Sequence, residues 1–165
     1  MKKFELTSET KINIFGKKLF RIKALVSFGV VKTGETGGWV EKEENVNQSG
    51  DAWVFGDAEV FGNAEVSGDA WVFGNARVSG NAEVFGNAEV SGNADYTTIH
   101  GFGTQFRTTT FFRCKDKQVK VSCGCFYGTI PEFREQVKNT RDGKIAEEYL
   151  MIADLMEKHF AEEAK

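Results

Sequence analysis

The chain has 165 residues, of which 27% are charged and 41% hydrophobic, and a formal net charge of −3. These values are typical of a globular protein of one or two small units. No apolar run approaches the ~18 residues that a membrane-spanning helix needs, and the N-terminus lacks the apolar core of a signal peptide. We therefore expect no membrane partner and a location in the cytoplasm of the cell that makes the protein.

The first part of the chain predicts a small β cap over residues 1–49. Apolar residues alternate loosely in residues 4–15 and 18–31, which predicts short strands joined by a turn at Gly16. Residues 34–49, GETGGWVEKEENVNQS, predict a glycine-broken acidic loop. Three apolar residues are expected to plug the open end of the element that follows: Phe28, Trp39 and Val40.

Residues 50–97 consist of eight uninterrupted hexads: GDAWVF, GDAEVF, GNAEVS, GDAWVF, GNARVS, GNAEVF, GNAEVS and GNADYT. A strict short period predicts a solenoid. Ala and Val stand two apart, so on an extended segment both point to one face. The inward set begins with Ala52, Val54, Ala58 and Val60. Each Gly with the following Asp or Asn supplies a corner, because these residues tolerate positive φ.

This period resembles the hexapeptide-repeat, left-handed parallel β-helix, in which three hexads close a triangular coil of 18 residues. The segments RIKAL and GGWVEKE ahead of the hexads resemble the N-terminal cap of such repeats in many phage and prophage proteins. The resemblance implies a mainly β fold built on a short left-handed parallel β-helix. It also implies a temperate phage or prophage source.

Residues 18 apart share one side of such a prism, and one side collects four large aromatic residues: Trp53, Phe55, Trp71 and Phe73. An exposed aromatic patch marks an interface. Three alternatives stay open for it: self-association, which is most often threefold in this fold family, cover by the chain's own termini, or docking of a ligand or foreign partner. We expect a homo-oligomer, with a trimer favoured.

The hexads also carry most of the negative charge. Residues 50–97 contain one basic and eight acidic side chains. An acidic prism repels phosphate backbones, so nucleic acid is not expected to lie along the repeats.

The period stops after the eighth hexad, and residues 98–165 are expected to form a small C-terminal α+β domain. The β-prone runs 106–114 and 119–127 predict a hairpin. The segments GFGTQFRTTTFFRCKD and VSCGCFYGTIPEFREQV resemble an uncharacterised domain that often follows such repeats in phage-encoded proteins. That resemblance implies no activity.

Two helices are expected at the end of the chain. Thr129, followed by Glu132 three residues later, predicts a capping box and a helix that runs to about Asn139. A second helix is expected over residues 144–164. Its apolar stripe predicts core packing and consists of Ile145, Tyr149, Ile152, Met156 and Phe160.

Histidine and cysteine residues predict no catalytic or metal site. A hexapeptide acyltransferase needs a histidine beside the coil as general base, and His100 lies just past the coils. An acyltransferase that uses His100 is therefore kept as the enzymatic alternative. Cys114, Cys123 and Cys125 with His100 offer zinc ligands at poor spacing. Reduced, buried thiols are the preferred interpretation, and no cofactor is expected.

One cluster between residues 101 and 113 suggests an anion site. It combines glycine amides, hydroxyl groups and guanidinium groups, which together hold phosphate in many proteins: Gly101, Gly103, Thr104, Arg107, Thr108, Thr109 and Arg113. The alternative is that these residues only solvate a strand edge.

These patterns favour a non-enzymatic phage or prophage accessory protein. In this hypothesis an oligomeric β-helix scaffold presents C-terminal modules that bind a host target without turnover. The target would be a host defence protein or a nucleotide signal, so that the protein acts as a host defence inhibitor. The alternatives are an acyltransferase-like enzyme and a structural or assembly protein of the virion.

Overall fold

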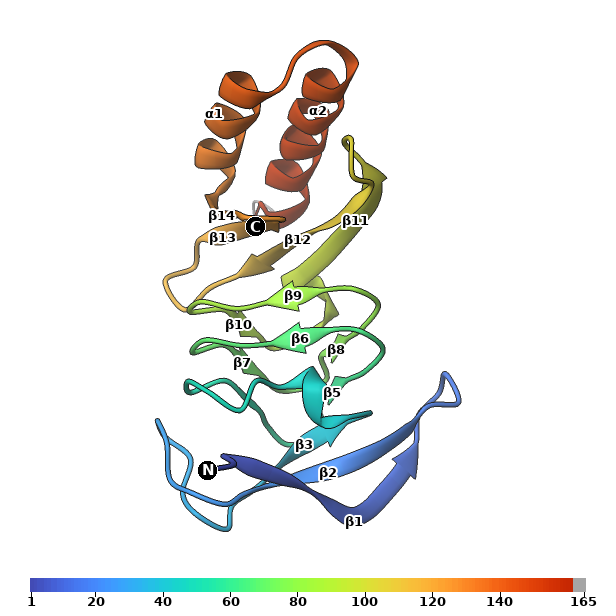
Figure 1. Cartoon of the computed structure of the whole chain (residues 1–165), viewed down its shortest axis with the longest axis vertical. Coiled ribbons are helices and arrows are strands. Elements are labelled where there is room, and N and C mark those ends of the chain that lie inside the picture. The colour runs from blue at the N-terminus through green and yellow to red at the C-terminus, as the bar shows by residue number, and fades with distance from the viewer. Residues whose placement is uncertain (162–165) are drawn as a thin grey trace.

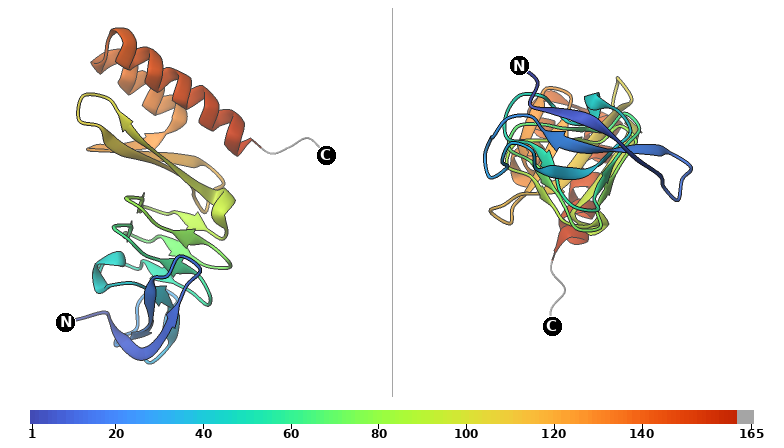
Figure 2. Two further views of the ribbon diagram at one scale, coloured as in Figure 1. Left: turned by 90° about the vertical axis from the view of Figure 1, so that its right-hand side faces the viewer. Right: turned by 90° about the horizontal axis from the view of Figure 1, so that it is seen from below.

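The computed structural model describes residues 1–161. Its parts follow one another along the long axis of the molecule (Figures 1 and 2). The N-terminal strands lie at one end and the hexads in the middle. A four-stranded sheet and two helices form the other end. The fold is mainly β, with a small helical part at the C-terminal end.

The first seven hexads each contribute one two-residue strand. These strands are β4 (Trp53–Val54), β5 (Glu59–Val60), β6 (Glu65–Val66), β7 (Trp71–Val72), β8 (Arg77–Val78), β9 (Glu83–Val84) and β10 (Glu89–Val90). β4, β5, β6 and β7 each pair in parallel with the strand three hexads later, as in Val54 opposite Val72 and Val72 opposite Val90. Three parallel ladders result: β4–β7–β10, β5–β8 and β6–β9.

Ala and Val fill the interior of this repeat stack, as predicted. Ala52, Val54 and Val60 are 0% exposed, and the matching residues of later hexads are buried too. The corners leave little space: a Cβ on Gly68 would lie 2.9 Å from the amide nitrogen of Gly86 one rung away. Gly68 also has a φ of +64°, so only glycine fits without strain.

The N-terminal segment forms the predicted pair of strands. β1 (Phe4–Ile12) and β2 (Lys18–Ala24) run antiparallel, and Gly16 in the turn between them has a φ of +77°. Val40 lies in the main apolar core and the half-buried Phe28 packs against it, as expected of a plug. Trp39 differs, because it packs in a separate small cluster with Leu19 and Phe61.

The loop predicted over residues 34–49 is wrong in part, because Thr36–Val40 forms strand β3. β3 pairs antiparallel with β2 and parallel with β5, so the parallel ladders begin before the first hexad. Gly37 and Gly38 allow this approach, since a Cβ on either would lie 2.6 Å from the side chain of Trp53 or Val54. A short 3₁₀ helix, η1 (Glu43–Asn45), then leads into the hexads.

The eighth hexad does not continue the stack. Its GNAD portion forms a 3₁₀ helix, η2 (Asn93–Asp95), and strand β11 (Tyr96–Phe102) follows. Tyrosine stands where the other hexads have valine, and its hydroxyl donates to the backbone carbonyl of Arg77 instead of filling the interior. The Asp95 carboxylate accepts from the amide of Ser91 at 2.8 Å. These contacts end the stack one hexad earlier than the period predicts.

The C-terminal sheet has the order β11–β12–β13–β14, all antiparallel. Its other strands are β12 (Arg107–Arg113), β13 (Val119–Cys123) and β14 (Phe126–Thr129). The single strand predicted over residues 119–127 is broken at Gly124, which has a φ of +58°. The predicted hairpin is therefore part of a larger sheet.

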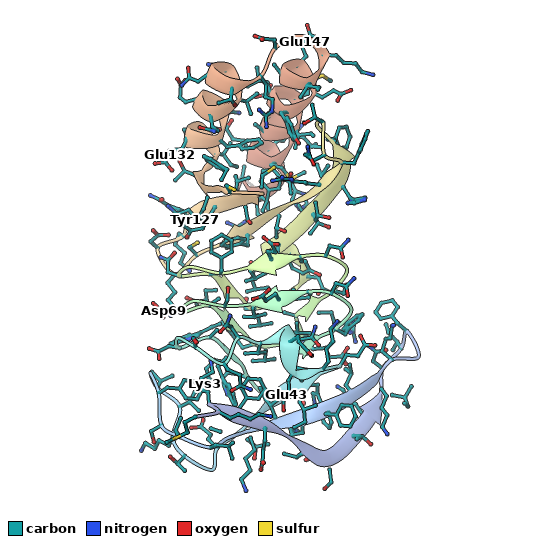
Figure 3. All side chains as sticks on the ribbon, viewed as in Figure 1. Lys3, Glu43, Asp69, Tyr127, Glu132 and Glu147 are labelled. Carbon is teal, nitrogen blue, oxygen red and sulfur yellow. The ribbon has the colours of Figure 1, made fainter. Side chains whose placement is uncertain are left out.

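This sheet has one face on the repeat stack and the other under the helices. On the first face, the Thr110 hydroxyl accepts from the amide of Glu83 at 3.1 Å, and the Phe112 ring lies 5.9 Å from the Phe85 ring. Tyr127 lies on the flank of this junction (Figure 3), with its ring 4.6 Å from Phe85. On the second face, Phe111 joins the helical core.

The two helices are α1 (Ile130–Thr140) and α2 (Gly143–Phe160). The predicted cap is confirmed, because the Thr129 hydroxyl accepts from the Glu132 amide at 3.3 Å. The α2 stripe is core, as predicted, with Ile145 half-buried and the rest buried. The predicted end of this helix at residue 164 lies outside the described residues. Neither helix, over the part of the chain that the structure describes, is long and apolar enough to cross a membrane.

A candidate anion-binding cleft

The aromatic residues predicted as an interface do not form one exposed face. Trp53 is 0% exposed, because two rings from the N-terminal segment pack edge-on against it. The ring centroids of Phe4 and Phe28 lie 5.8 and 5.3 Å from that of Trp53. The expectation that Trp53 faces a partner is therefore wrong, and cover by the chain's own terminus holds for this residue.

The remaining aromatics of that side are partly covered. Trp71 is half-buried, with the Phe55 ring 5.7 Å away and the Lys115 ammonium 3.7 Å from its ring centroid. Phe55 and Phe73 are also half-buried. An apolar strip persists here, but it is much smaller than the sequence predicts.

The residues predicted as an anion site are divided by the structure. Arg107 and Arg113 stand at opposite ends of β12, about 20 Å apart at ~3.3 Å per residue. Arg113 is already engaged: its Nε lies 3.3 Å from the Asp95 carboxylate, and its Nη2 donates to the Phe160 carbonyl at 2.8 Å. Arg113 therefore has no free guanidinium face for a shared site with Arg107.

The other predicted residues are distributed as well. Thr108 Oγ1 lies 2.9 Å from the ring Nδ1 of His100 on the neighbouring strand. Thr109 is buried, and its hydroxyl donates to the Cys123 sulfur at 3.2 Å. Gly101 lies where the β11–β12 register shifts. Of the predicted set, only Gly103, Thr104 and Arg107 remain near one another.

Arg107 lines a cleft with residues from distant parts of the chain. Two adjoining cavities of about 250 Å³ each share the same four side chains: Arg107, Cys123, Arg141 and Tyr149. We call the combined space the arginine cleft. Its polar end adds Phe102, Thr104 and Gln105. Its apolar end adds Cys125, Phe126, Phe133, Gln136, Val137 and Thr140.

Two glycines make room for the walls of this cleft. The Tyr149 hydroxyl occupies the space where a side chain on Gly103 would start, and the Arg107 guanidinium does the same at Gly124. Both glycines have positive φ, +78° and +58°. Gly103, in the turn after β11, thus lets α2 pack closely against that turn. Gly124, in the turn after β13, leaves space for the Arg107 side chain. Figure 2 shows the β11–β12 turn on the same side of the molecule as the start of α2.

The arginine cleft carries positive charge that no protein carboxylate neutralises. Four arginines lie within 3.5 Å of an acidic side chain: Arg21, Arg77, Arg113 and Arg134. Arg107 and Arg141 have no such partner within residues 1–161. No Asp or Glu is among the residues that line the cleft. Two guanidinium groups therefore face one cavity uncompensated.

Tyr149 contributes a hydroxyl donor to the same cavity. Burial raises the pKa of this phenol, and the nearby Cys123 thiol raises the pKa further, while Arg141 and Arg107 act in the opposite direction. The phenol therefore stays protonated at neutral pH. An anion in the cleft would meet two guanidinium groups and a neutral O–H donor.

The cysteines do not gather into a metal site. Cys114 lies in the main core, where burial, and then Asp116, raise the pKa of its thiol to about 11. Cys123 lines the cleft and is half-exposed, and Cys125 is exposed, so the prediction of buried thiols is correct for Cys114 and wrong for the other two. Among residues 1–161, no group of three His, Cys, Asp or Glu side chains has the geometry to hold a metal ion.

The sequence did not reveal Arg141 and Tyr149 as site residues. Arg141 lies between the two helices that the sequence predicts, and Tyr149 belongs to the predicted core stripe. The available signal was weak: Arg141 stands in the RDG connection, outside any apolar pattern. Nothing in the spacing links it to Arg107, because the rest of β12, two further strands and a helix separate them.

No protein-family model matches the chain, and no curated protein sequence matches it either. The function of the cleft is therefore inferred from its own geometry and charge.

Proposed function

We propose that this chain is a non-enzymatic binding protein, in which a short left-handed parallel β-helix carries a C-terminal module that holds a small anion in the arginine cleft. One observation supports this most strongly: the two arginines without a carboxylate partner line the same cavity. Guanidinium groups bind phosphate and carboxylate through paired, charge-assisted hydrogen bonds. Both arginines are exposed, so water screens the repulsion between them, and an anion bound between the two guanidinium groups would interact favourably with both charges.

The scaffold part of the proposal rests on the repeat stack. Parallel ladders that recur every 18 residues, inward Ala and Val, and positive-φ corners are the features of a triangular coil. The left hand of the coil and membership among hexapeptide-repeat proteins belong to the proposal. The N-terminal sheet lies over one end of the stack and the C-terminal sheet over the other, which protects the strand edges that a short solenoid exposes.

Binding without turnover fits the lining of the cleft. General acid–base catalysis most often uses a histidine or a carboxylate, and the lining residues include neither. Tyr149 lines the cleft, but its pKa is raised, which makes it a poor base at neutral pH. The Cys123 thiol accepts a hydrogen bond from Thr109 and has no base beside it. His100, which the acyltransferase alternative requires, lies on β11 against Thr108 and does not line the cleft.

The biological part of the proposal is sequestration. A phage or prophage accessory protein with this cleft would hold a small anionic signal of the host's defence, which the cavity suits better than a defence protein. Trimer formation through Phe55, Trp71 and Phe73 stays a separate prediction, since the Trp53 ring is already covered.

Isothermal titration calorimetry with inorganic phosphate and pyrophosphate tests the anion site. We expect the parent chain to bind at least one of these probes and the Arg107→Gln, Arg141→Gln double variant to bind about 100-fold more weakly. A hydrogen bond to a charged group contributes about 1.5–3 kcal/mol, and two are removed. Pyrophosphate recovered without hydrolysis after the titration would show that the bound anion is not turned over.

Arg134→Gln is the matched control. It removes the same charge from α1, but Arg134 pairs with Asp154 and Glu157 outside the cleft, so binding should stay as in the parent. Equal affinity of the parent and the double variant would refute the arginine cleft as the binding site. Absence of binding by the parent would refute the proposed function.

A further inference from the structure

We infer that the arginine cleft takes a phosphate monoester whose other end is a flat aromatic ring, as in a nucleoside monophosphate. This inference rests on the proposed function and adds the class of ligand. It comes from the apolar end of the cleft, which a simple inorganic anion would leave empty.

Three aromatic rings in series build that apolar end. The Phe126 and Phe133 ring centroids lie 5.6 Å apart, and those of Phe133 and Tyr149 lie 5.7 Å apart at an interplanar angle of 88°. Phe133 and Tyr149 are buried, whereas Phe126 is half-exposed. Part of the Phe126 side chain therefore lines this end of the cleft together with Val137, where it could contact a planar group.

The charge of the cleft matches a phosphate monoester better than a carboxylate. The two guanidinium groups supply two positive charges without a neighbouring acid. A phosphate monoester carries a charge of about −1.5 to −2 at neutral pH, which compensates both, whereas a carboxylate compensates one. Arg107 and Arg141 belong to both ends of the cleft, so the phosphate would lie at the junction.

The dimensions leave space on both sides of that junction. Each cavity of about 250 Å³ is about eight times the ~30 Å³ that a water molecule occupies in the liquid. A phosphate group fills only part of such a volume. The ester's ring would then lie in the apolar end, against Phe126 and beside the planar guanidinium of Arg107 or Arg141.

Neutral hydrogen-bonding groups flank the predicted ring and sugar positions. Gln136 reaches the apolar end from α1, and Thr104 and Gln105 reach the polar end from the β11–β12 turn. Amide and hydroxyl groups pair with sugar hydroxyls and ring edges without adding charge. The arginine cleft thus offers a distinct environment for each part of a nucleoside monophosphate.

Calorimetric titration of the full parent chain with four probes tests this inference: inorganic phosphate, ribose 5-phosphate, adenosine, and adenosine 5′-monophosphate. We expect the nucleotide to bind at least tenfold more tightly than ribose 5-phosphate, because a base stacked on an aromatic side chain contributes that much or more. Phe126→Leu should remove this difference while leaving the affinity for ribose 5-phosphate unchanged. Phe15→Leu, at the exposed tip of the β1–β2 hairpin, should leave all four affinities unchanged.

The outcomes separate this inference from the proposed function. Equal affinities for the nucleotide and ribose 5-phosphate would overturn the ring site while leaving anion binding intact. Binding of adenosine as tight as that of the nucleotide would overturn phosphate recognition. No binding of any phosphate probe would overturn both. The series on the parent chain needs no variant, so a folding defect of Phe126→Leu would not obscure the result.

Discussion

The repeat stack and the C-terminal module use charged side chains in different ways. In the stack, the buried Glu59 is paired: its carboxylate lies 2.9 Å from Lys11 and 3.4 Å from Arg77. In the module, Arg107 and Arg141 face a cavity with no acid among its lining residues. Glu59 is buried and paired, whereas Arg107 and Arg141 are exposed, line one cavity and have no acidic partner within residues 1–161, so they can bind a ligand. The difference locates the candidate site in the aperiodic part of the chain.

The largest expected loss of stability comes from a substitution at the centre of the repeat stack. Val72 is 0% exposed and lies between Val54 and Val90 in a three-strand ladder. Val72→Asp would bury an unpaired carboxylate, so we expect a loss of at least ~4 kcal/mol in the free energy of unfolding. Urea denaturation followed by circular dichroism measures this free energy of unfolding.

Asn75→Asp is the matched control for this substitution. It adds the same carboxylate at an exposed corner, where other hexads already have Asp, so stability should change by less than ~0.5 kcal/mol. If both variants were equally stable, the interior of the stack would not be the source of its stability.

A smaller loss of stability is expected when the buried, paired carboxylate of Glu59 is replaced. Glu59→Gln leaves Lys11 and Arg77 facing a neutral amide, and the Asn13 side chain loses a charged acceptor at 3.3 Å. We expect a loss of about 2–3 kcal/mol, because hydrogen bonds to a buried charged group are replaced by weaker ones. Glu65→Gln, the same hexad position in an exposed setting, should change stability little. An equal effect of the two substitutions would mean that the Glu59 network contributes nothing to the fold.

The repeat stack could be predicted because almost every hexad places the same residue types at the same positions. Inward Ala and Val and the glycine corners need no knowledge of distant residues. The two ends could not be predicted in this way. β3 departs from the hexad pattern and fits only because Gly37 and Gly38 pass against Trp53 and Val54. At the other end, Tyr96 replaces valine and starts an antiparallel strand.

The candidate site, like the two ends of the stack, could be predicted only in part from local sequence. Arg107 and Thr104 could be proposed from local composition, because glycine, threonine and arginine cluster there. Arg113 belongs to the same local cluster but is taken up by Asp95 and the Phe160 carbonyl. Arg141 enters the cleft only through the packing of α2 on the sheet. Tertiary contacts of this kind produce no repeated pattern in the sequence, so they could not be predicted from it.

The smallest effect concerns the junction of the N-terminal segment and the stack. Lys3 is 4% exposed, and its ammonium donates to the carbonyls of Gly50 at 3.2 Å and Ala52 at 2.8 Å. Burial lowers the pKa of Lys3 to about 8, with Asp51 opposing the shift. The unfolded chain keeps this proton up to about pH 10.4. Between these values the unfolded state binds more protons, so this group's contribution to stability rises with pH.

The measurement compares the free energy of unfolding at pH 7.5 and 9.5 in three chains. Relative to Lys3→Met, the parent should gain somewhat under ~2 kcal/mol over this range. Cys114 and the tyrosines, whose pKa values are raised, lower stability as the pH rises, but they are present in every chain and cancel in the difference. Lys2→Met, which alters an exposed pair with Glu43, should behave as the parent does. A pH dependence shared by all three chains would show that the buried Lys3 ammonium keeps its proton in the fold over this range.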